Sequence, residues 1–306
     1  MARHFLSLLD WQREEIKTIL ARAAAFKKRV KGKSVPQSLS GKVLGLVFEK
    51  SSTRTRVSFE VAMRKLGGHS LYLTQETSQL GRGETYEDTA RVLSRYLDGI
   101  VLRTFEQTKL ERMAKFSSVP VINGLSDLLH PCQVLADLMT MTENKKSLSD
   151  SKVAWVGDGN NMANSWIEAA ILFGFSLRLA CPEGYDPSAF KKGRSLKLTR
   201  SPQEACRGAD VINTDTWISM GQEGRTTDHG LRTTDLTEKK KLFRPYQVNK
   251  DLLKEAKPDA IILHCLPAHR GEEITDEVMD GPRSRVWDQA ENRMYVQMAL
   301  LEKILS

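Results

Sequence analysis

The sequence is poor in cysteine and contains no long apolar run. Its four cysteines, among 306 residues, show neither the CxxC nor the Cys/His spacing of a zinc site or a disulfide framework. Such usage is typical of a reducing compartment, and we predict a cytoplasmic protein. The segment 11–16, which contains three consecutive charged residues, directly follows the first apolar residues, and no window approaches the length of a membrane span. We therefore expect neither a signal sequence nor a membrane partner.

Aromatic residues are also scarce, at 7% of the chain, and they do not alternate with basic residues as on surfaces that stack bases. The formal net charge of +8 attracts polyanions in general, but the basic residues are scattered along the chain. The densest run, residues 239–241, holds three lysines directly after Glu238. We therefore expect no nucleic-acid partner.

The sequence does contain a regular alternation of apolar runs and amphipathic helical patterns. This alternation predicts parallel sheets with helices on both faces. A chain of 306 residues exceeds one typical core and suits two domains of about 150 residues each. The predicted fold class is α/β, with two doubly wound parallel-sheet domains that face each other across a cleft, and a C-terminal helix.

The predicted elements form two successive groups. The expected strands are residues 42–48, 70–73, 99–103 and 119–123, then 152–157, 176–181, 210–213 and 260–263. The expected helices are residues 54–66, 86–97, 106–116, 132–143 and 292–304. The polar residues 142–150 separate the groups. We predict one domain at residues 1–140, joined by the C-terminal helix at 290–306, and a second at residues 141–289.

The segment 52–56, with the sequence Ser-Thr-Arg-Thr-Arg, lies where the first predicted strand gives way to a helix. Free backbone N–H groups and the positive end of the helix dipole converge at such a point, and guanidinium groups add charged donors. The segment therefore predicts a phosphate site. The alternative is that Arg54 and Arg56 are ordinary solvated helix residues.

Other polar residues also lie where predicted strands end, which is the edge where open parallel sheets bind ligands. They are Arg103, the His-Pro-Cys-Gln segment at 130–133, Asn160 with Asn161, Asp215, and the His-Cys-Leu-Pro segment at 264–267. Their common position predicts an active site in the cleft between the two sheets.

Each of these features also has a purely structural explanation. His130 could cap the helix that follows it, Asp215 could cap a turn, and Cys265 has the apolar neighbours of a buried cysteine. The loop at 156–161 follows a strand as a dinucleotide-binding loop does. It lacks the third glycine of that fingerprint, which argues against a nicotinamide oxidoreductase.

Four motifs together resemble those of the aspartate/ornithine carbamoyltransferase family. They are the segments 52–56 and 130–133, the Asp-Thr-Trp-Ile-Ser-Met-Gly segment at 215–221, and the segment 264–267. Further agreement at 88–93 and 291–293 extends the resemblance over essentially the whole chain. The first two motifs are shared by both branches of the family. The last two are similar to the ornithine-specific branch, since the aspartate enzymes typically have a proline where Cys265 stands.

The resemblance implies transfer of the carbamoyl group of carbamoyl phosphate to the δ-amine of L-ornithine, which gives L-citrulline and phosphate. It implies arginine biosynthesis rather than arginine catabolism. Carbamoyl phosphate is already activated by its leaving group, so no cofactor and no metal ion is expected. The alternative is a carbamoyltransferase for another amine, such as putrescine or N-acetylornithine.

The resemblance also implies which residues form the site. The implied catalytic residues are Thr55, Arg103, His130 and Cys265. Those implied to bind carbamoyl phosphate are Ser52, Thr53, Arg54, Thr55, Gln79, Arg103, His130, Gln133, Cys265, Leu266 and Arg293. Those implied to bind ornithine are Asn161, Asp215, Ser219 and Met220.

Gln79 carries a further implication of the resemblance. The aspartate enzymes lend a lysine from the corresponding loop to a neighbouring subunit, whereas residues 74–91 contain no lysine. We therefore expect a homo-oligomer, a trimer or a multiple of trimers, in which Gln79 contributes to a neighbouring site. Separately, residues 221–244 are polar and contain three glycines, which predicts a closing lid rather than a packed element.

Overall fold

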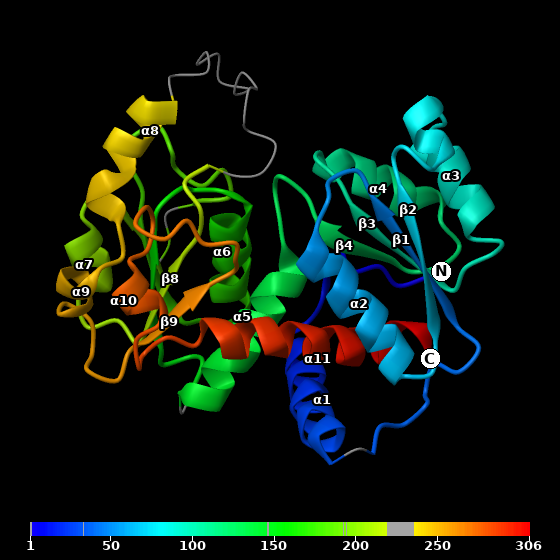
Figure 1. Cartoon of the computed structure of the whole chain (residues 1–306), viewed down its shortest axis with the longest axis horizontal. Coiled ribbons are helices and arrows are strands. Elements are labelled where there is room, and N and C mark those ends of the chain that lie inside the picture. Colours follow the sequence, from blue (N-terminus) through cyan, green and yellow to red (C-terminus); the bar gives the residue numbers. More distant parts are fainter. Residues whose placement is uncertain (1, 33, 146, 192, 194, 219–235) are drawn as a thin grey trace. The chain divides into compact units, whose positions relative to one another are not determined.

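A computed structural model describes residues 2–32, 34–145, 147–191, 193, 195–218 and 236–306. The chain divides into two compact units, Met1–Met139 with Glu291–Ser306, and Thr140–Ala290. Two helices, α5 (Pro131–Asn144) and α11 (Val286–Leu305), contribute residues to both units. Each unit is built on one parallel sheet (Figure 1).

The first unit contains a four-stranded sheet in the order β2-β1-β3-β4. Its strands are β1 (Val43–Phe48), β2 (His69–Thr74), β3 (Gly99–Arg103) and β4 (Val121–Leu125). The last five residues of β1 and all of β3 are buried, as expected of parallel strands covered on both faces. The helices wholly within this unit are α1 (Arg13–Lys31), α2 (Thr53–Lys65), α3 (Tyr86–Leu93) and α4 (Gln107–Phe116). Among the described residues, the 3₁₀ helices η1 (Leu8–Asp10) and η2 (Gln79–Arg82) also lie in this unit, whereas η3 (Arg244–Tyr246) lies in the second unit.

The second unit contains a five-stranded sheet in the order β7-β6-β5-β8-β9. Its strands are β5 (Lys152–Val156), β6 (Ser176–Ala180), β7 (Leu196–Thr199), β8 (Val211–Thr214) and β9 (Ile261–His264). Its helices are α6 (Asn161–Phe173), α7 (Pro202–Cys206), α8 (Leu236–Phe243), α9 (Lys250–Leu253) and α10 (Asp276–Met279). Trp155 and Trp166 are fully buried and anchor β5 and α6 in the core.

Both sheets reverse their winding direction at one place. In the first, the chain winds outward from β1 to β2 and then returns to the other side of β1 with β3 and β4. In the second, it winds from β5 to β7 and returns beside β5 with β8 and β9. Loops that follow the central strands diverge at such a switch point and leave a crevice at the carboxyl ends of the strands. The switch points are therefore β1/β3 and β5/β8.

The predicted α/β class and the two parallel sheets are confirmed, but several element bounds are wrong. The strand predicted at 119–123 begins at Val121, because Pro120 has no N–H for the ladder. The helix predicted at 86–97 ends at Leu93, where Ser94 caps it and its hydroxyl donates to the Ala90 carbonyl at 2.6 Å. The final helix begins at Val286 rather than 292.

Several further elements were not predicted from the sequence, among them α1, α6, β7 and the short helices α7, α9 and α10. α1 and α6 are long helices, of 19 and 13 residues, in stretches for which no helix was predicted. β7 is a short edge strand in which only Leu196 is buried. Among the described residues, no helix combines the length and the apolar character that crossing a membrane requires.

Candidate active site

The predicted phosphate segment caps α2. Ser52 is the N-cap residue, and its hydroxyl oxygen accepts a hydrogen bond from the Thr55 backbone N–H at 3.3 Å. The first turn of this 13-residue helix contains no acidic residue, while Arg64 and Lys65 occupy the last turn. The helix dipole and the uncapped N–H groups at its start are thus available to an anion.

The hydroxyl of Thr55 is where the polar side chains of the first unit converge. Its oxygen accepts from the Ser52 hydroxyl at 3.0 Å, from Nη1 of Arg103 at 3.4 Å and from Nη2 of Arg293 at 2.5 Å. A hydroxyl oxygen has only two lone pairs, so three donors exceed what it can accept. An oxyanion with several acceptor oxygens would satisfy all of them.

Arg293 connects Thr55 to the segment that begins α5. Its Nη1 donates to Oε1 of Gln133 at 3.2 Å, and its Nη2 lies 3.1 Å from Nε2 of His130. A guanidinium group can only donate, so Nε2 of His130 is the acceptor in this contact. The Gln133 amide donates in turn to Oδ1 of Asp137 at 2.9 Å, which fixes its orientation.

Two guanidinium groups are buried in this set of residues. The residues Arg103 and Arg293 are 6% and 5% exposed, and their N–H groups share the Thr55 oxygen as an acceptor. Burying two like charges together is unfavourable unless an anion compensates them. The set therefore has the charge and the donors of an anion site.

His130 is neutral in this environment. Burial lowers its pKa well below 6.5, and the positive charges of Arg293 and Arg103 lower it further. A neutral imidazole beside two guanidinium groups can donate or accept a hydrogen bond without adding a third positive charge.

This low pKa of His130 predicts how stability depends on pH. The unfolded chain takes up a proton near pH 6.5 and the folded chain does not, so the free energy of unfolding falls as pH drops below that value. The slope from this one residue is up to about 1.4 kcal/mol per pH unit. Urea unfolding at pH 7 and pH 5.5 should therefore show a smaller pH effect in His130→Gln than in the wild type. The exposed His269→Gln is the matched control; an unchanged slope in His130→Gln would contradict the assignment.

The structure leaves other predicted residues of the first unit at the surface. Thr53 and Arg54 are exposed on the first turn of α2, and Ser52 is half-buried. Gln79 is exposed at the start of η2. Phosphate binding by Arg54 and the contribution of Gln79 to a neighbouring site therefore stay predictions.

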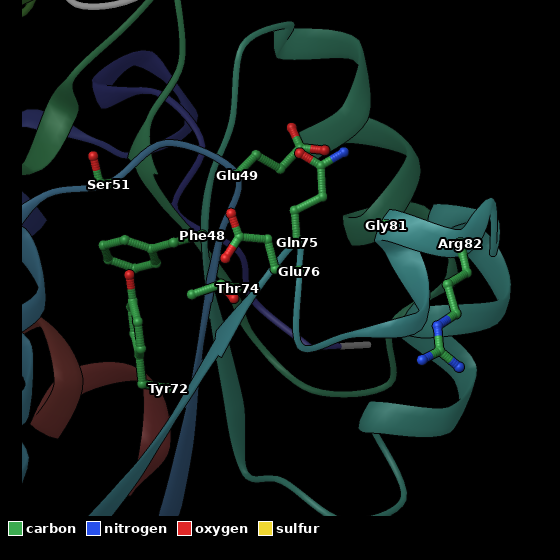
Figure 2. A pocket seen from close by; sticks show the side chains of 9 residues that line it. All are labelled: Phe48, Glu49, Ser51, Tyr72, Thr74, Gln75, Glu76, Gly81 and Arg82. Atoms are coloured by element: carbon green, nitrogen blue, oxygen red, sulfur yellow. The ribbon is translucent and has the colours of Figure 1, made fainter.

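A pocket of about 430 Å³ lies beside the end of β1. Its lining comes from β1, β2 and the turn that leads through η2, as Figure 2 shows, and it includes Ser51, Tyr72 and Arg82. Two carboxylates, Glu49 and Glu76, also line it, and they disfavour a phosphate. The Thr55 hydroxyl and its guanidinium neighbours are not part of its lining, so this pocket is not the anion site.

The polar residues of the second unit converge on Asp215. Its Oδ2 accepts a hydrogen bond from the Asn160 amide at 2.8 Å. Its Oδ1 accepts from Sγ of Cys265 at 2.9 Å and from the Thr216 backbone N–H at 2.8 Å. Asn160 follows β5, Asp215 follows β8 and Cys265 follows β9, and these three strands are neighbours in the sheet. Asp215 is 8% exposed and Cys265 is half-buried. A carboxylate held in this way at a switch point is suited to an ammonium group.

The other predicted residues of the second unit have different outcomes. Asn161 is half-buried at the start of α6, and its neighbour Asn160 contacts Asp215. Leu266 is half-buried next to Cys265. Ser219 and Met220 lie outside the described residues.

Part of the predicted lid is a packed helix instead. Residues 221–235 lie outside the described residues, whereas residues 236–243 form α8. Phe243 is fully buried, and Nζ of Lys239 donates to Oδ2 of Asp158 at 2.9 Å. The lid prediction is therefore wrong for this part, because a buried aromatic ring and a partly buried ion pair hold α8 to the unit.

Asn160 was predicted to lie at the site edge, but two contacts of the second unit were not predicted from the sequence. Asn160 caps α6 through its Oδ1 and orients Asp215 through its amide nitrogen. An asparagine before a helix is a known capping signal, but its second contact depends on the pairing of β5 with β8. The ion pair of Asp158 with Lys239 joins residues 81 positions apart, which no local pattern predicts.

Two family models match the chain. The model described as aspartate/ornithine carbamoyltransferase, carbamoyl-P binding domain, matches residues 3–143. The model described as aspartate/ornithine carbamoyltransferase, Asp/Orn binding domain, matches residues 149–304.

Individual proteins are similar over the full length. An ornithine carbamoyltransferase of Geobacter metallireducens is 52% identical over 313 residues, and the match covers 100% of both chains. The anabolic ornithine carbamoyltransferase of Pseudomonas aeruginosa is 51% identical, over 99% of this chain and 97% of that one. The solved structure of ornithine carbamoyltransferase from Pyrococcus furiosus has a TM-score of 0.90 and 51% identity, covering 98% of this chain and 96% of the other.

Proposed function

Because the chain belongs to the aspartate/ornithine carbamoyltransferase family, we propose that it transfers the carbamoyl group of carbamoyl phosphate to the δ-amine of L-ornithine. The products are L-citrulline and inorganic phosphate. Relatives matched over their full length carry the name of the ornithine enzyme, which supports ornithine over putrescine or N-acetylornithine. One is named anabolic, which supports a role in arginine biosynthesis.

The observation that carries the proposal is the convergence of Arg103 and Arg293 on the Thr55 hydroxyl. Two buried guanidinium groups at a helix start match a phosphoryl group in charge and in number of donors. Ser52, Thr53 and Arg54 add a hydroxyl, backbone N–H groups and a further positive charge at the same helix start. The first unit accordingly binds carbamoyl phosphate.

The carbamoyl end of that substrate is bound by groups next to the phosphate donors. Thr55 and Arg103 donate to the carbonyl oxygen, where negative charge grows as the tetrahedral transition state forms, and His130 donates through Nδ1–H because its Nε2 accepts from Arg293. Neutral His130 is suited to this hydrogen bond, because it stabilises the oxygen without competing for the phosphate. Gln133 binds the carbamoyl NH₂ group, and the carbonyl groups of Cys265 and Leu266 complete its hydrogen bonds.

The second unit binds ornithine. The carboxylate of Asp215 accepts from the α-ammonium group, while Asn161, Ser219 and Met220 bind the α-carboxylate. Cys265 lies beside the δ-amine, which must be neutral to react. Because Sγ of Cys265 is 2.9 Å from Oδ1 of Asp215, the two ornithine contacts are connected directly.

In the reaction, the nitrogen lone pair of the δ-amine forms a bond with the carbonyl carbon. The bond from that carbon to the phosphate oxygen then breaks, and the electron pair leaves with phosphate. The departing phosphate takes up the proton that the amine loses, so no protein general base is required. Catalysis consists of positioning and of charge stabilisation by fixed donors.

The proposal includes a cytoplasmic homo-oligomer, a trimer or a multiple of trimers, in which Gln79 reaches a neighbouring site. The exposure of Gln79 on η2 supports this arrangement, because its side chain is free to contact another copy. The lack of a helix that could cross a membrane, among the residues described, agrees with this location.

Subunit mixing tests the shared site. Gln79→Ala and Arg103→Gln chains are each expected to lose most of their activity, since each lacks one required donor. Mixed oligomers should recover part of the citrulline formation, because an intact Arg103 then meets Gln79 from the other parent. The two variants are mixed, unfolded in urea and refolded together, and the control is the same mixture without this step. Confirmed exchange with no recovered activity, or an active Gln79→Ala enzyme, would contradict the shared site.

The function itself is tested by citrulline formation from carbamoyl phosphate with a panel of amines. We expect turnover with L-ornithine and much slower turnover with putrescine, N-acetylornithine and L-aspartate. Turnover of another amine in preference to ornithine would assign a different acceptor. Absence of carbamoyl transfer to every amine would reject the proposed function.

A further inference from the structure

The turn after β9 contains an unusual backbone conformation. Leu266 has a φ of 62°, and among the described residues it is the single non-glycine residue with a positive φ. The left-handed region is unfavourable for a residue with a Cβ atom, so it persists only where neighbouring groups hold it. Leu266 is also the residue whose carbonyl group is proposed to bind the carbamoyl NH₂ group.

The side chain of His264 holds this turn. His264 ends β9 and is 1% exposed, and its Nδ1 lies 2.9 Å from the backbone nitrogen of Leu266. A backbone N–H can only donate, so Nδ1 carries no hydrogen and the ring is neutral with its hydrogen on Nε2. The imidazole therefore acts as an acceptor toward the turn.

Glu273 fixes the opposite side of the ring. Nε2–H of His264 donates to Oε1 of Glu273 at 3.0 Å, and the same oxygen accepts from the His269 backbone N–H at 2.6 Å. Both side chains are fully buried. The backbone N–H of His264 also donates to Oε1 of Gln289 at 2.9 Å. The ring is thus fixed in position and in tautomer before any ligand arrives.

We propose that His264 is a positioning residue, whose Nδ1 holds Leu266 in the left-handed conformation and thereby directs the Cys265 and Leu266 carbonyl groups toward the carbamoyl NH₂ group. Glu273 acts one step further away, by keeping the hydrogen of the ring on Nε2. The inference rests on the proposed function and extends it to two residues that do not touch the substrate. His264 was predicted only as part of the segment 264–267, with no role of its own, and Glu273 was not predicted.

A metal site is the competing interpretation of the same residues. The ligand atoms of Asp215, His264 and Cys265 lie within 4.8 Å of one another. Both ring nitrogens of His264 are already engaged, one by the Leu266 N–H and one by Glu273. A metal at Nδ1 would have to displace the hydrogen bond that holds the turn, so the geometry favours the positioning role.

Two substitutions of His264 test its two ring nitrogens one at a time. In His264→Asn the carboxamide oxygen lies near the position of Nδ1 and can accept from Leu266, whereas contact with Glu273 is lost. In His264→Gln the amide nitrogen lies near the position of Nε2 and can donate to Glu273, whereas the acceptor for Leu266 is lost. His269→Asn and His269→Gln are matched controls, because that side chain is exposed and only its backbone N–H is used here.

The expected results differ between the two variants. His264→Gln should raise the KM for carbamoyl phosphate at least about tenfold, while His264→Asn stays within about threefold of the wild type. Hydrogen exchange of the Leu266 amide should be accelerated in His264→Gln and remain slow in His264→Asn. Equal KM values in the two variants, or the reverse order, would overturn the proposal.

A second pair tests the same inference without changing His264. Glu273→Gln keeps an oxygen acceptor for Nε2–H, whereas Glu273→Leu removes it and frees the ring to change tautomer. We expect faster exchange of the Leu266 amide and a raised KM in Glu273→Leu only. Identical behaviour of Glu273→Gln and Glu273→Leu would overturn the proposal even if both His264 variants failed to fold.

The two measurements distinguish this inference from the proposed function. Amide exchange reports the conformation of the turn whether or not the chain forms citrulline. An inactive wild type with variant-dependent exchange would reject the function and retain the role of His264 in the turn. An active wild type with equal exchange in all variants would reject the role of His264 alone.

Discussion

Arg103→Gln is expected to lower kcat for citrulline formation by about 10²- to 10³-fold and to weaken carbamoyl phosphate binding. Arg103 is 6% exposed, and its Nη1 donates to the Thr55 hydroxyl. In the proposed reaction, the Arg103 guanidinium stabilises both the phosphate charge and the charge that develops on the carbonyl oxygen. Glutamine retains an amide donor but removes the positive charge, so the loss should exceed that of a single neutral hydrogen bond.

The same substitution should not destabilise the fold. Removing one of two buried positive charges relieves their mutual repulsion, so we expect the free energy of unfolding to stay the same or to rise. Steady-state kinetics and urea unfolding measure the two effects. Arg112→Gln is the matched control, since Arg112 forms a surface ion pair with Glu87 and should retain full activity. Loss of activity together with a large loss of stability would contradict the assignment of Arg103 to an anion site.

Asp215→Asn is expected to lower kcat/KM for ornithine by about 30- to 1,000-fold, while phosphate binding changes little. Asparagine has nearly the same shape but no charge to pair with the α-ammonium group. It also places an amide nitrogen opposite the Asn160 amide nitrogen. Asn160 cannot turn to compensate, because its Oδ1 accepts from the Met162 and Ala163 backbone N–H groups at the start of α6. The substitution therefore loses an ion pair and one supporting hydrogen bond.

The two pockets can be compared in one set of measurements. Calorimetric titration with inorganic phosphate reports the first unit, and the dependence of rate on ornithine reports the second. Asp251→Asn is the control for an acid changed to an amide, because Asp251 on α9 forms an exposed pair with Lys254, the residue that caps this helix. Equal losses of phosphate binding and ornithine use in Asp215→Asn would contradict the separation of the two pockets.

Local patterns were sufficient to predict the parts of the fold that position the site. β1 is a continuous apolar run, and Ser52 follows it with a capping hydroxyl, so the strand, the helix start and the phosphate prediction came from adjacent residues. Arg103 and Asp215 were identified by the same reasoning, because each stands where an apolar strand ends. Parallel sheets place such strand ends at one edge, so local signals sufficed.

The contacts between distant residues could not be predicted in this way. Arg293 donates to Thr55 across 238 positions, and its place in α11 gives no local sign of that contact. The role of Arg293 came from the family resemblance instead. His264 was named only as part of a motif, because the left-handed conformation of Leu266 and the burial of Glu273 are properties of the folded turn. β7 was missed because a half-exposed edge strand carries little apolar signal.

The excess of hydrogen-bond donors around the Thr55 hydroxyl also affects how the phosphate product leaves the site. In the proposed function these donors bind the phosphoryl oxygens, which free phosphate retains when the carbamoyl group has left. The released product therefore fits the empty site as well as the phosphoryl end of the substrate does. Free phosphate is therefore expected to compete with carbamoyl phosphate, so the phosphate concentration around the enzyme sets the fraction of sites open to new substrate.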